Sequence, residues 1–168
     1  FRIGAKKIAL NHSVKVLATD VKASNGIVHV IDEVLVPLMN LVDTLKANKL
    51  DTLAQAIQAA GLGETLAGEH EKFTIFAPTD EAFAQLNKVP DDLAAVLLYH
   101  VVRGNEVKSN LRLVNALQTV QGGLIHINAD RTGNFRINES RIGAANILAS
   151  NGVVHVIDRV LMPPADDN

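Results

Sequence analysis

The 168-residue sequence contains no cysteine and no tryptophan, and aromatic residues make up only 4% of it. Without cysteine, the chain has no disulfide framework, no thiolate metal site and no cysteine nucleophile. The scarcity of aromatic side chains predicts an aliphatic core and argues against a stacking platform for nucleic-acid bases. No apolar run approaches the roughly 20 residues that a membrane-spanning helix needs, so we expect no direct membrane insertion.

The sequence also lacks an excess of charge of either sign. Lys and Arg number 16 against 18 Asp and Glu, which gives a net charge of -2 with His neutral. Because nucleic-acid-binding domains usually carry a strong positive excess, we expect no nucleic-acid partner. The chain begins at Phe1 rather than Met, and we interpret it as a processed or excised piece of a longer protein.

An internal repeat divides the chain. Residues 25–37 read NGIVHVIDEVLVP and residues 151–163 read NGVVHVIDRVLMP, identical at ten of 13 positions with an offset of 126 residues. A period of this length is the size of a domain rather than of a solenoid repeat. We therefore predict a complete domain over residues 38–163. Residues 1–37 are then the C-terminal segment of a preceding domain, and residues 164–168 form a tail or linker.

The first half of the predicted domain has helical patterns. Apolar spacing indicates helices near residues 41–45 and 50–57, with Asp51 as the N-cap of the second and Gly61 at its end. After a short alternating strand at residues 73–77, Thr79 can cap a helix whose first turn contains Asp80. A further helix is expected over residues 93–99.

The second half has strand patterns instead. Turn signals and period-two alternation predict strands over residues 117–120, 124–128, 135–138, 142–147, 153–157 and 159–162. Helices first and antiparallel-looking strands later favour an α+β fold over a wound parallel sheet.

Three segments resemble the signatures of the fasciclin domain family, and they occur in the family's order. They are residues 73–83 (FTIFAPTDEAF), the pair Tyr99–His100, and residues 151–161 (NGVVHVIDRVL). The resemblance implies an α+β fold, a wedge-shaped β-sandwich with helices packed on it. It also implies secreted or cell-surface anchored proteins, often tandem arrays, that attach cells to a receptor or to a component of the extracellular matrix.

In animal members of this family, an Asp-Ile pair just before the last signature is associated with integrin binding. The matching residues are Asn146 and Ile147 in the complete domain and Asp20 and Val21 in the first copy, so neither copy keeps the pair. We take these residues, with Leu148 and the stretch 103–112, as candidate binding residues.

The polar residues of the motifs are interpreted as structural. We interpret His155, on an apolar strand face, as a hydrogen-bonded core residue, and Tyr99 and His100 as a buried pair bonded to one another. Asp158, which recurs in the repeat as Asp32, is expected to bind nearby backbone amides. The histidine spacing indicates no metal site, and no catalytic motif or cofactor-binding loop is present, so we expect no enzyme.

Two N-x-S sequences predict a glycoprotein. Asn11 and Asn138 are the acceptor residues.

The sequence therefore predicts a non-enzymatic, extracellular adhesion or matrix module that binds through protein or glycan surface contacts. One alternative is a carrier of a small apolar ligand such as a pigment, in a groove between helices and sheet. Another is a fibre-forming subunit, a homo-oligomer joined through the unpaired strand edges of residues 1–37.

Overall fold

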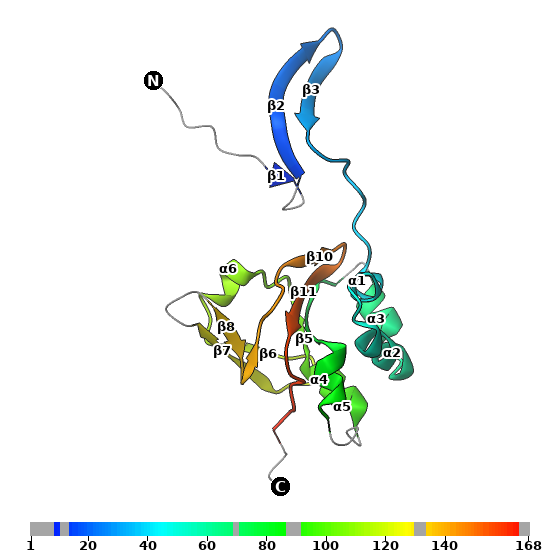
Figure 1. Cartoon of the computed structure of the whole chain (residues 1–168), viewed down its shortest axis with the longest axis vertical. Helices are drawn as coiled ribbons and strands as arrows, with labels where there is room; N and C mark the ends of the chain where they lie inside the picture. The colour runs from blue at the N-terminus through cyan, green and yellow to red at the C-terminus, as the bar shows by residue number, and fades with distance from the viewer. Residues whose placement is uncertain (1–8, 11–13, 69–70, 87–91, 130–133, 165–168) are drawn as a thin grey trace. The chain divides into compact units, whose positions relative to one another are not determined.

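A computed structural model describes residues 9–10, 14–68, 71–86, 92–129 and 134–164 of the chain. The chain divides into two compact units, Phe1–Pro37 and Leu38–Asn168 (Figure 1).

Unit 1 is a small antiparallel sheet. Its strands are β1 (Ala9–Leu10), β2 (Val14–Ala23) and β3 (Gly26–Ile31), in the order β1-β2-β3. The β2–β3 hairpin keeps its alternating Val and Ile side chains largely exposed, with Ile27 at 61% and Val28 at 51%. Such exposure is unusual for β-branched residues in a strand, because a sheet normally buries one face.

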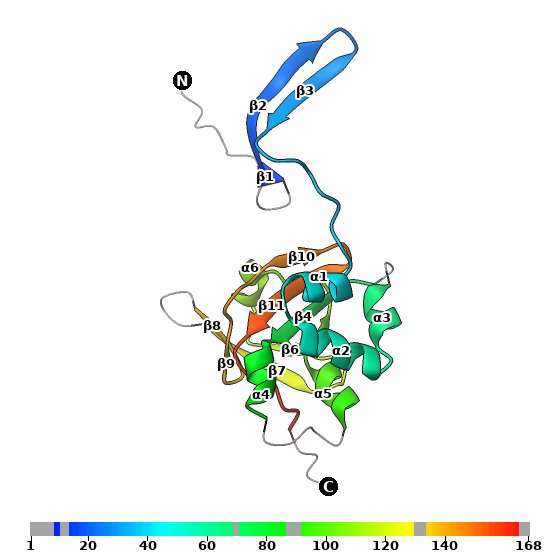
Figure 2. The same cartoon turned by 45° about the vertical axis from the view of Figure 1, so that its right-hand side comes forward.

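Unit 2 begins with three helices that lie together on one side of a sheet (Figure 2). They are α1 (Leu41–Ala47), α2 (Asp51–Ala59) and α3 (Gly63–Ala67). Gly61 follows α2 with a φ of 72°, the left-handed conformation that the predicted helix end requires. The predicted N-cap of α2 is wrong by one residue. Asp51 is the first residue of the helix, and the N-cap is Leu50, whose side chain makes no capping hydrogen bond.

The central sheet of unit 2 has the strand order β10-β11-β4-β5. Its strands are β4 (Phe73–Pro78), β5 (Val101–Arg103), β10 (Ile147–Ala149) and β11 (Gly152–Ile157). The expectation of antiparallel strands fails at the centre, where β11 pairs parallel to β4 from Gly152↔Phe73 to Ile157↔Pro78. The near-continuous apolar run of β11 is typical of a strand buried on both faces, as parallel strands are.

A second sheet of antiparallel strands has the order β6-β7-β8-β9. These strands are β6 (Ala116–Gln118), β7 (Leu124–Ala129), β8 (Phe135–Ile137) and β9 (Ser140–Arg141). The remaining helices are α4 (Asp80–Ala84), α5 (Leu93–Tyr99) and α6 (Lys108–Leu111).

Two apolar clusters hold the layers together. One joins the helices α1–α3 to the central sheet through residues such as Leu45, Ile57 and Val154. The other lies around the second sheet and contains Phe76 and Phe135. The arrangement confirms the predicted α+β class.

Two predicted strands are absent from the described residues. Only Ile147 of the stretch 142–147 is in a strand. Ile142 makes a single bridge to Ile157, and Asn146 has a left-handed φ of 60°. Residues 159–162, expected as a strand, are irregular and pair with no other strand.

Candidate functional site

His155 in β11 lies at the centre of the region that the sequence singled out for binding. Its Nε2 donates to the main-chain oxygen of Glu106 at 2.8 Å, and its Nδ1 accepts from the main-chain N–H of Asn146 at 3.3 Å. The ring stacks on Phe76 with centroids 5.6 Å apart. Burial lowers the pKa of His155 below its usual value, so the neutral tautomer that makes both bonds is favoured.

The two candidate binding segments, 103–112 and 146–148, meet around this histidine. Besides the His155 bonds, the side chain of Asn146 accepts from the N–H of Lys108 at 2.8 Å. Thr74 of β4 accepts from the N–H of Glu106 at 2.8 Å and donates to the oxygen of Gly104 at 2.9 Å. The loop before α6 is therefore fixed by buried polar groups of the central sheet.

This anchoring leaves a set of side chains pointing to solvent, which we call the loop surface. Its exposed members are Arg103, Asn105, Ser109, Asn110, Arg112 and Leu113. Leu113 is 85% exposed, the kind of apolar side chain that gains most from being covered. Ile147 and Leu148 are half-buried, and Asn146 uses its amide internally, so these candidates contribute less accessible area than the loop does.

Unit 1 repeats the local geometry of this site without the loop. Asp20 has a φ of 61°, and its N–H donates to Nδ1 of His29 at 3.2 Å. Asp20 and Val21 are both exposed.

Tyr99 and His100 are both buried, but they do not bond to one another as the sequence suggested. The Tyr99 hydroxyl donates to the main-chain oxygen of Leu124 at 2.7 Å. His100 donates from Nδ1 to the oxygen of Val96 at 2.7 Å and accepts at Nε2 from the N–H of Leu161 at 2.8 Å. Successive side chains at a helix end point in different directions, so each reaches its own partner.

Both nitrogens of His100 therefore bind main-chain atoms in a site without water access. Burial lowers the pKa of His100 to about 4, because the charged form of the ring would lose its hydration there, and the hydrogen bond to Val96 offsets only part of this effect. The histidine joins α5 to the segment after β11.

The remaining acidic motif residues also accept from main-chain N–H groups. Asp80 accepts from Thr52 at 3.1 Å, so it links α4 to the start of α2. Asp158 accepts from Arg141 at 2.8 Å, across 17 residues rather than locally. Thr79 accepts from Ala82 at 3.2 Å at the N-cap of α4.

Asn151 is a structural residue that the sequence motifs did not reveal. It is fully buried, and its amide donates to the oxygens of Leu66 and Gly68 at 2.7 and 3.0 Å. Its side-chain oxygen accepts from the N–H of Leu41 at 2.9 Å. The Asn-Gly pair predicted only a hairpin turn, which β10 and β11 do form. The local pattern gave no sign of the long-range bonds.

The predicted glycan acceptor Asn138 is half-buried and has a φ of 51°. Its side-chain oxygen accepts from the N–H of His126 at 2.8 Å, and its nitrogen donates to the Tyr99 hydroxyl at 3.3 Å. A glycan on this nitrogen would replace one of its two hydrogens and would have to fit beside the buried Tyr99 hydroxyl. Asn11 lies outside the described residues.

Within the described residues, no three His, Asp or Glu side chains come together as a metal site. None of the helices in that part of the chain has both the length and the apolar character needed to cross a bilayer.

Comparison with known proteins identifies the family. The family model of the fasciclin domain matches residues 1–37 and 48–163. The pig (Sus scrofa) transforming growth factor-beta-induced protein ig-h3 is 37% identical over 161 residues, which is 90% of this chain and 23% of that protein. The Synechocystis protein sll1483 is 34% identical over 145 residues, 75% of this chain and 74% of that protein.

Among solved structures, a FAS1 domain pair from the insect cell adhesion molecule Fasciclin I has the same fold. The TM-score is 0.63 at 21% sequence identity, covering 89% of this chain and 60% of that chain. The chain thus spans about a quarter of the pig relative and more than half of the domain pair. On the match of the family model to both units, the chain belongs to the fasciclin domain family.

Proposed function

We propose that this chain is a non-enzymatic adhesion module that acts outside the cell, secreted or anchored at the cell surface. Its partner is a cell-surface receptor or a component of the extracellular matrix. The observation that carries the proposal is the loop surface, where exposed polar side chains and Leu113 are held on a rigid frame around His155. The likeness to a domain pair from a cell adhesion molecule supports the same role.

The absence of catalysis is part of this proposal. Two histidines lie in the sequence motifs, His100 and His155. In each of them, both ring nitrogens form hydrogen bonds with main-chain atoms. A general base needs a nitrogen that can reach a substrate proton. These side chains instead give the module the rigidity that surface recognition needs.

An attachment assay on the protein as it exists tests the role. Cells or matrix-coated surfaces are presented with immobilised wild-type chain and with Leu113→Ser, whose exposed position leaves the fold intact. We expect attachment to fall severalfold, because an exposed apolar anchor at an interface is worth about 1–2 kcal/mol. Leu124→Ser, which removes a half-exposed leucine from β7, is the matched control. Unchanged attachment by Leu113→Ser would count against the loop surface.

We further propose that residues 1–37 are the closing segment of a preceding domain, so that the module works in a tandem array. Two hydrogen bonds within the β2–β3 hairpin match bonds at the end of unit 2. Asp32 accepts from the N–H of Lys15 at 2.7 Å, as Asp158 does from Arg141 at 2.8 Å. The left-handed residue of each copy donates its N–H to the histidine of the following strand: Asp20, within β2, to His29 at 3.2 Å, and Asn146, just before β10, to His155 at 3.3 Å.

The two hairpins differ in what covers them. Val153 and Val154 are fully buried, and Val154 belongs to the apolar cluster that includes α1–α3, whereas their counterparts Ile27 and Val28 are more than half exposed. Burying one such side chain stabilises a fold by about 1.5–3 kcal/mol. The open edge of β3 therefore matches a strand equivalent to β4, Phe73–Pro78, in the preceding domain. Linked domains would add weak contacts through their effective concentration.

Amide hydrogen exchange tests this arrangement. In the present chain we expect fast exchange at the β3 N–H groups that face away from β2, and slow exchange at those of β11. A longer chain, made by joining residues 38–139 to the N-terminal side of residues 14–168, supplies a copy of β4 that can pair with β3. In that chain the same β3 N–H groups should become protected from exchange. Protection that grows with the concentration of the present chain would instead indicate the homo-oligomer through residues 1–37.

A further inference from the structure

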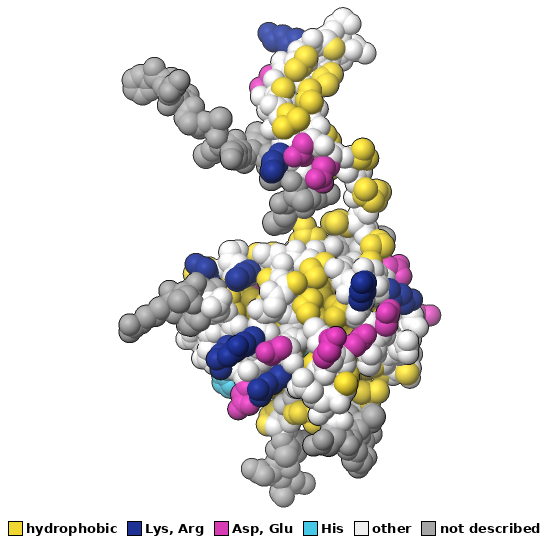
Figure 3. All heavy atoms as spheres, viewed as in Figure 1, with side chains coloured by type: hydrophobic (Ala, Val, Ile, Leu, Met, Phe, Trp, Pro, Cys, Tyr) yellow, Lys and Arg dark blue, Asp and Glu magenta, His cyan; other side chains and the backbone are white. Residues whose placement is uncertain are grey.

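Charge is segregated along unit 2, although the whole chain is nearly neutral. Residues 38–100, which contain α1–α5 and β4, have four Lys against nine Asp and Glu, a net charge of -5. Residues 101–162 have seven Lys and Arg against four Asp and Glu, a net charge of +3. Figure 3 shows Lys and Arg gathered on the side of unit 2 where β8 lies in Figure 1, and Asp and Glu prevailing over the helices.

On the positive side, a polar row crosses three neighbouring strands. Asn128 of β7 is directly opposite Arg136 of β8, which is directly opposite Arg141 of β9. Residues opposite one another point to the same face of a sheet, and all three are exposed. They line one side of a surface groove of about 540 Å³, whose wall also includes Phe135 and Ile142.

The two arginines of this row have no counter-ion in the part of the chain that the structure describes. Within the described residues, neither guanidinium of Arg136 and Arg141 has a carboxylate or carbonyl partner, and the ion pair of this region joins Arg159 to Glu139 at 3.9 Å. Asp158 is near, but its carboxylate accepts from the main-chain N–H of Arg141. Like charges directly opposite in a sheet are destabilising. The pairing of Arg136 with Arg141 therefore lowers the stability of the fold, and a role in binding would account for it.

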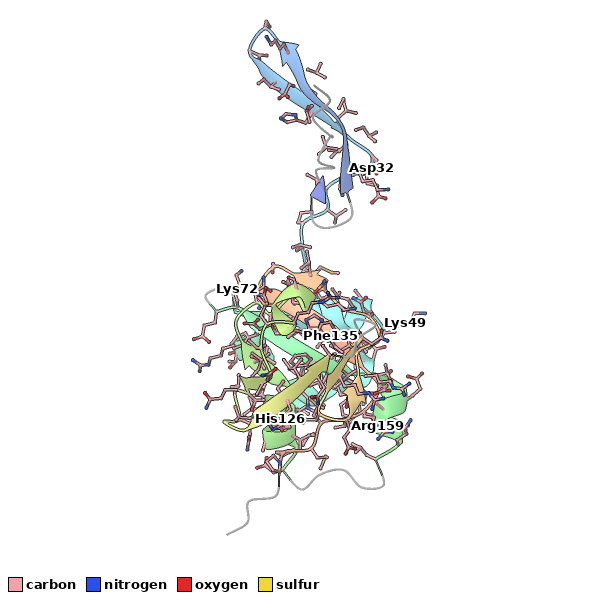
Figure 4. All side chains as sticks on the ribbon, turned by 90° about the vertical axis from the view of Figure 1, so that its left-hand side faces the viewer. Asp32, Lys49, Lys72, His126, Phe135 and Arg159 are labelled. Carbon is pink, nitrogen blue, oxygen red and sulfur yellow. The ribbon has the colours of Figure 1, made fainter. Side chains whose placement is uncertain are left out.

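Two more cations lie over the ring of Phe135, one of the residues that line the groove. Nζ of Lys108 is 5.5 Å and the guanidinium carbon of Arg112 is 5.8 Å from the centroid of the Phe135 ring. Figure 4 shows Phe135 beside α6, the helix that begins at Lys108. These two cations do not line the groove, but they add to the positive potential on this side of unit 2, which attracts anions.

We propose that the groove over β7, β8 and β9 binds a uronate-bearing acidic polysaccharide. Arg136 and Arg141 would each take a carboxylate, since the planar guanidinium binds that group through two parallel hydrogen bonds. The amide of Asn128, a donor and an acceptor, suits a sugar hydroxyl. This inference rests on the proposed surface-contact function and names one partner class for it.

The composition of the face favours a saccharide over an acidic protein segment. Protein interfaces usually centre on exposed Tyr, Trp or Phe anchors. The chain has no Trp, its single Tyr is 2% exposed, and Phe135 is equally buried. A polymer that carries a carboxylate and hydroxyls on each unit needs no such anchor.

Binding of the full chain to oligogalacturonate, measured by calorimetry at low and physiological salt, tests the proposal. We expect Arg136→Gln/Arg141→Gln to bind roughly tenfold or more weakly, from the loss of two charge-assisted contacts. The matched control is Lys46→Gln/Lys49→Asn, which removes two exposed cations from the helical side. Asn suits the left-handed φ of 58° at Lys49. The control should bind like the wild type, and affinity should fall as salt rises.

Unfolding of the arginine variant in urea distinguishes a ligand-binding role from a structural one. Its midpoint should be unchanged or higher, because the repulsion across β8 and β9 is removed. Three results would overturn the proposal: no binding by the wild type, equal losses in both double variants, or equally tight binding of poly-glutamate. The attachment assay with Leu113→Ser does not depend on any of these three results. The saccharide proposal can therefore fail while the adhesion role stands.

Discussion

The side-chain oxygen of Asn151 accepts a hydrogen bond from the main-chain N–H of Leu41 at 2.9 Å, across 110 residues of sequence. The same side chain holds the end of α3, so one buried amide connects the β10–β11 turn to two helices. Its counterpart in the repeat, Asn25, is exposed and makes none of these bonds in the described part of the chain.

Asn151→Ala should therefore destabilise the protein by about 2–4 kcal/mol, because it leaves buried main-chain groups without partners. Urea unfolding followed by circular dichroism measures the loss. Asn25→Ala is the matched control and should change the free energy of unfolding by less than about 0.5 kcal/mol. Similar losses in both variants would mean that the hairpin of unit 1 is docked like that of unit 2.

Gly152→Ala should be at least as damaging. A Cβ at Gly152 would collide with the carbonyl group of Phe73 on β4, and backbone atoms of two paired strands cannot easily move apart. We expect a loss of about 3 kcal/mol or more, or failure to fold. At Gly26, the equivalent position in unit 1, a Cβ meets nothing within 4 Å, so Gly26→Ala should be neutral. Thermal unfolding of the two variants makes the comparison.

His100 should make the domain sensitive to acid. Its pKa is about 4 in the folded protein against the ordinary 6.5 of a histidine in the unfolded chain, so the unfolded chain takes up a proton first as the pH falls. The contribution of His100 to the free energy of unfolding is fully present above about pH 6.5. It is lost as the pH falls towards 4, which lowers the free energy of unfolding by roughly 3 kcal/mol. The lowered pKa of His155 acts in the same direction.

Urea unfolding at pH 7 and pH 4.5 checks this dependence. His100→Gln should be less stable than wild type at pH 7 but should lose less on acidification. The exposed His126, changed to Gln, should keep the wild-type dependence. Equal stability of the wild-type chain at both pH values contradicts the assignment.

Asn138 should carry a glycan on only a small fraction of folded molecules. Its amide is bonded to His126 and Tyr99, and the hydroxyl of Ser140, the third acceptor-sequence residue, donates to the oxygen of Arg159. The intact mass of chain secreted by a glycosylating host, before and after enzymatic deglycosylation, reports occupancy. Asn11→Gln and Asn138→Gln separate the two sites, and full occupancy of Asn138 would show that the glycan is added before these bonds form.

Short-range features of this domain could be predicted because they depend on neighbouring residues. The helix cap at Thr79 and the left-handed Gly61 each follow from local sterics and hydrogen bonding. The strand at residues 73–77 was also predicted, but its expected alternation is absent because all of Phe73–Pro78 is buried. The binding role of segments 103–112 and 146–148 stays a prediction. That these segments meet around His155 could not be predicted, because no local pattern states which distant loops share a buried partner.

By itself the sequence determined the family, through its motifs, and it predicts the two-part organisation, through a repeat long enough to be a domain. Tertiary structure alone decided that β11 lies parallel to β4, that Asn151 joins the helices, and that Arg136 and Arg141 face one groove. The physical reason is that side-chain patterns state which face of a strand is buried, whereas strand neighbours are chosen by the packing of the whole core.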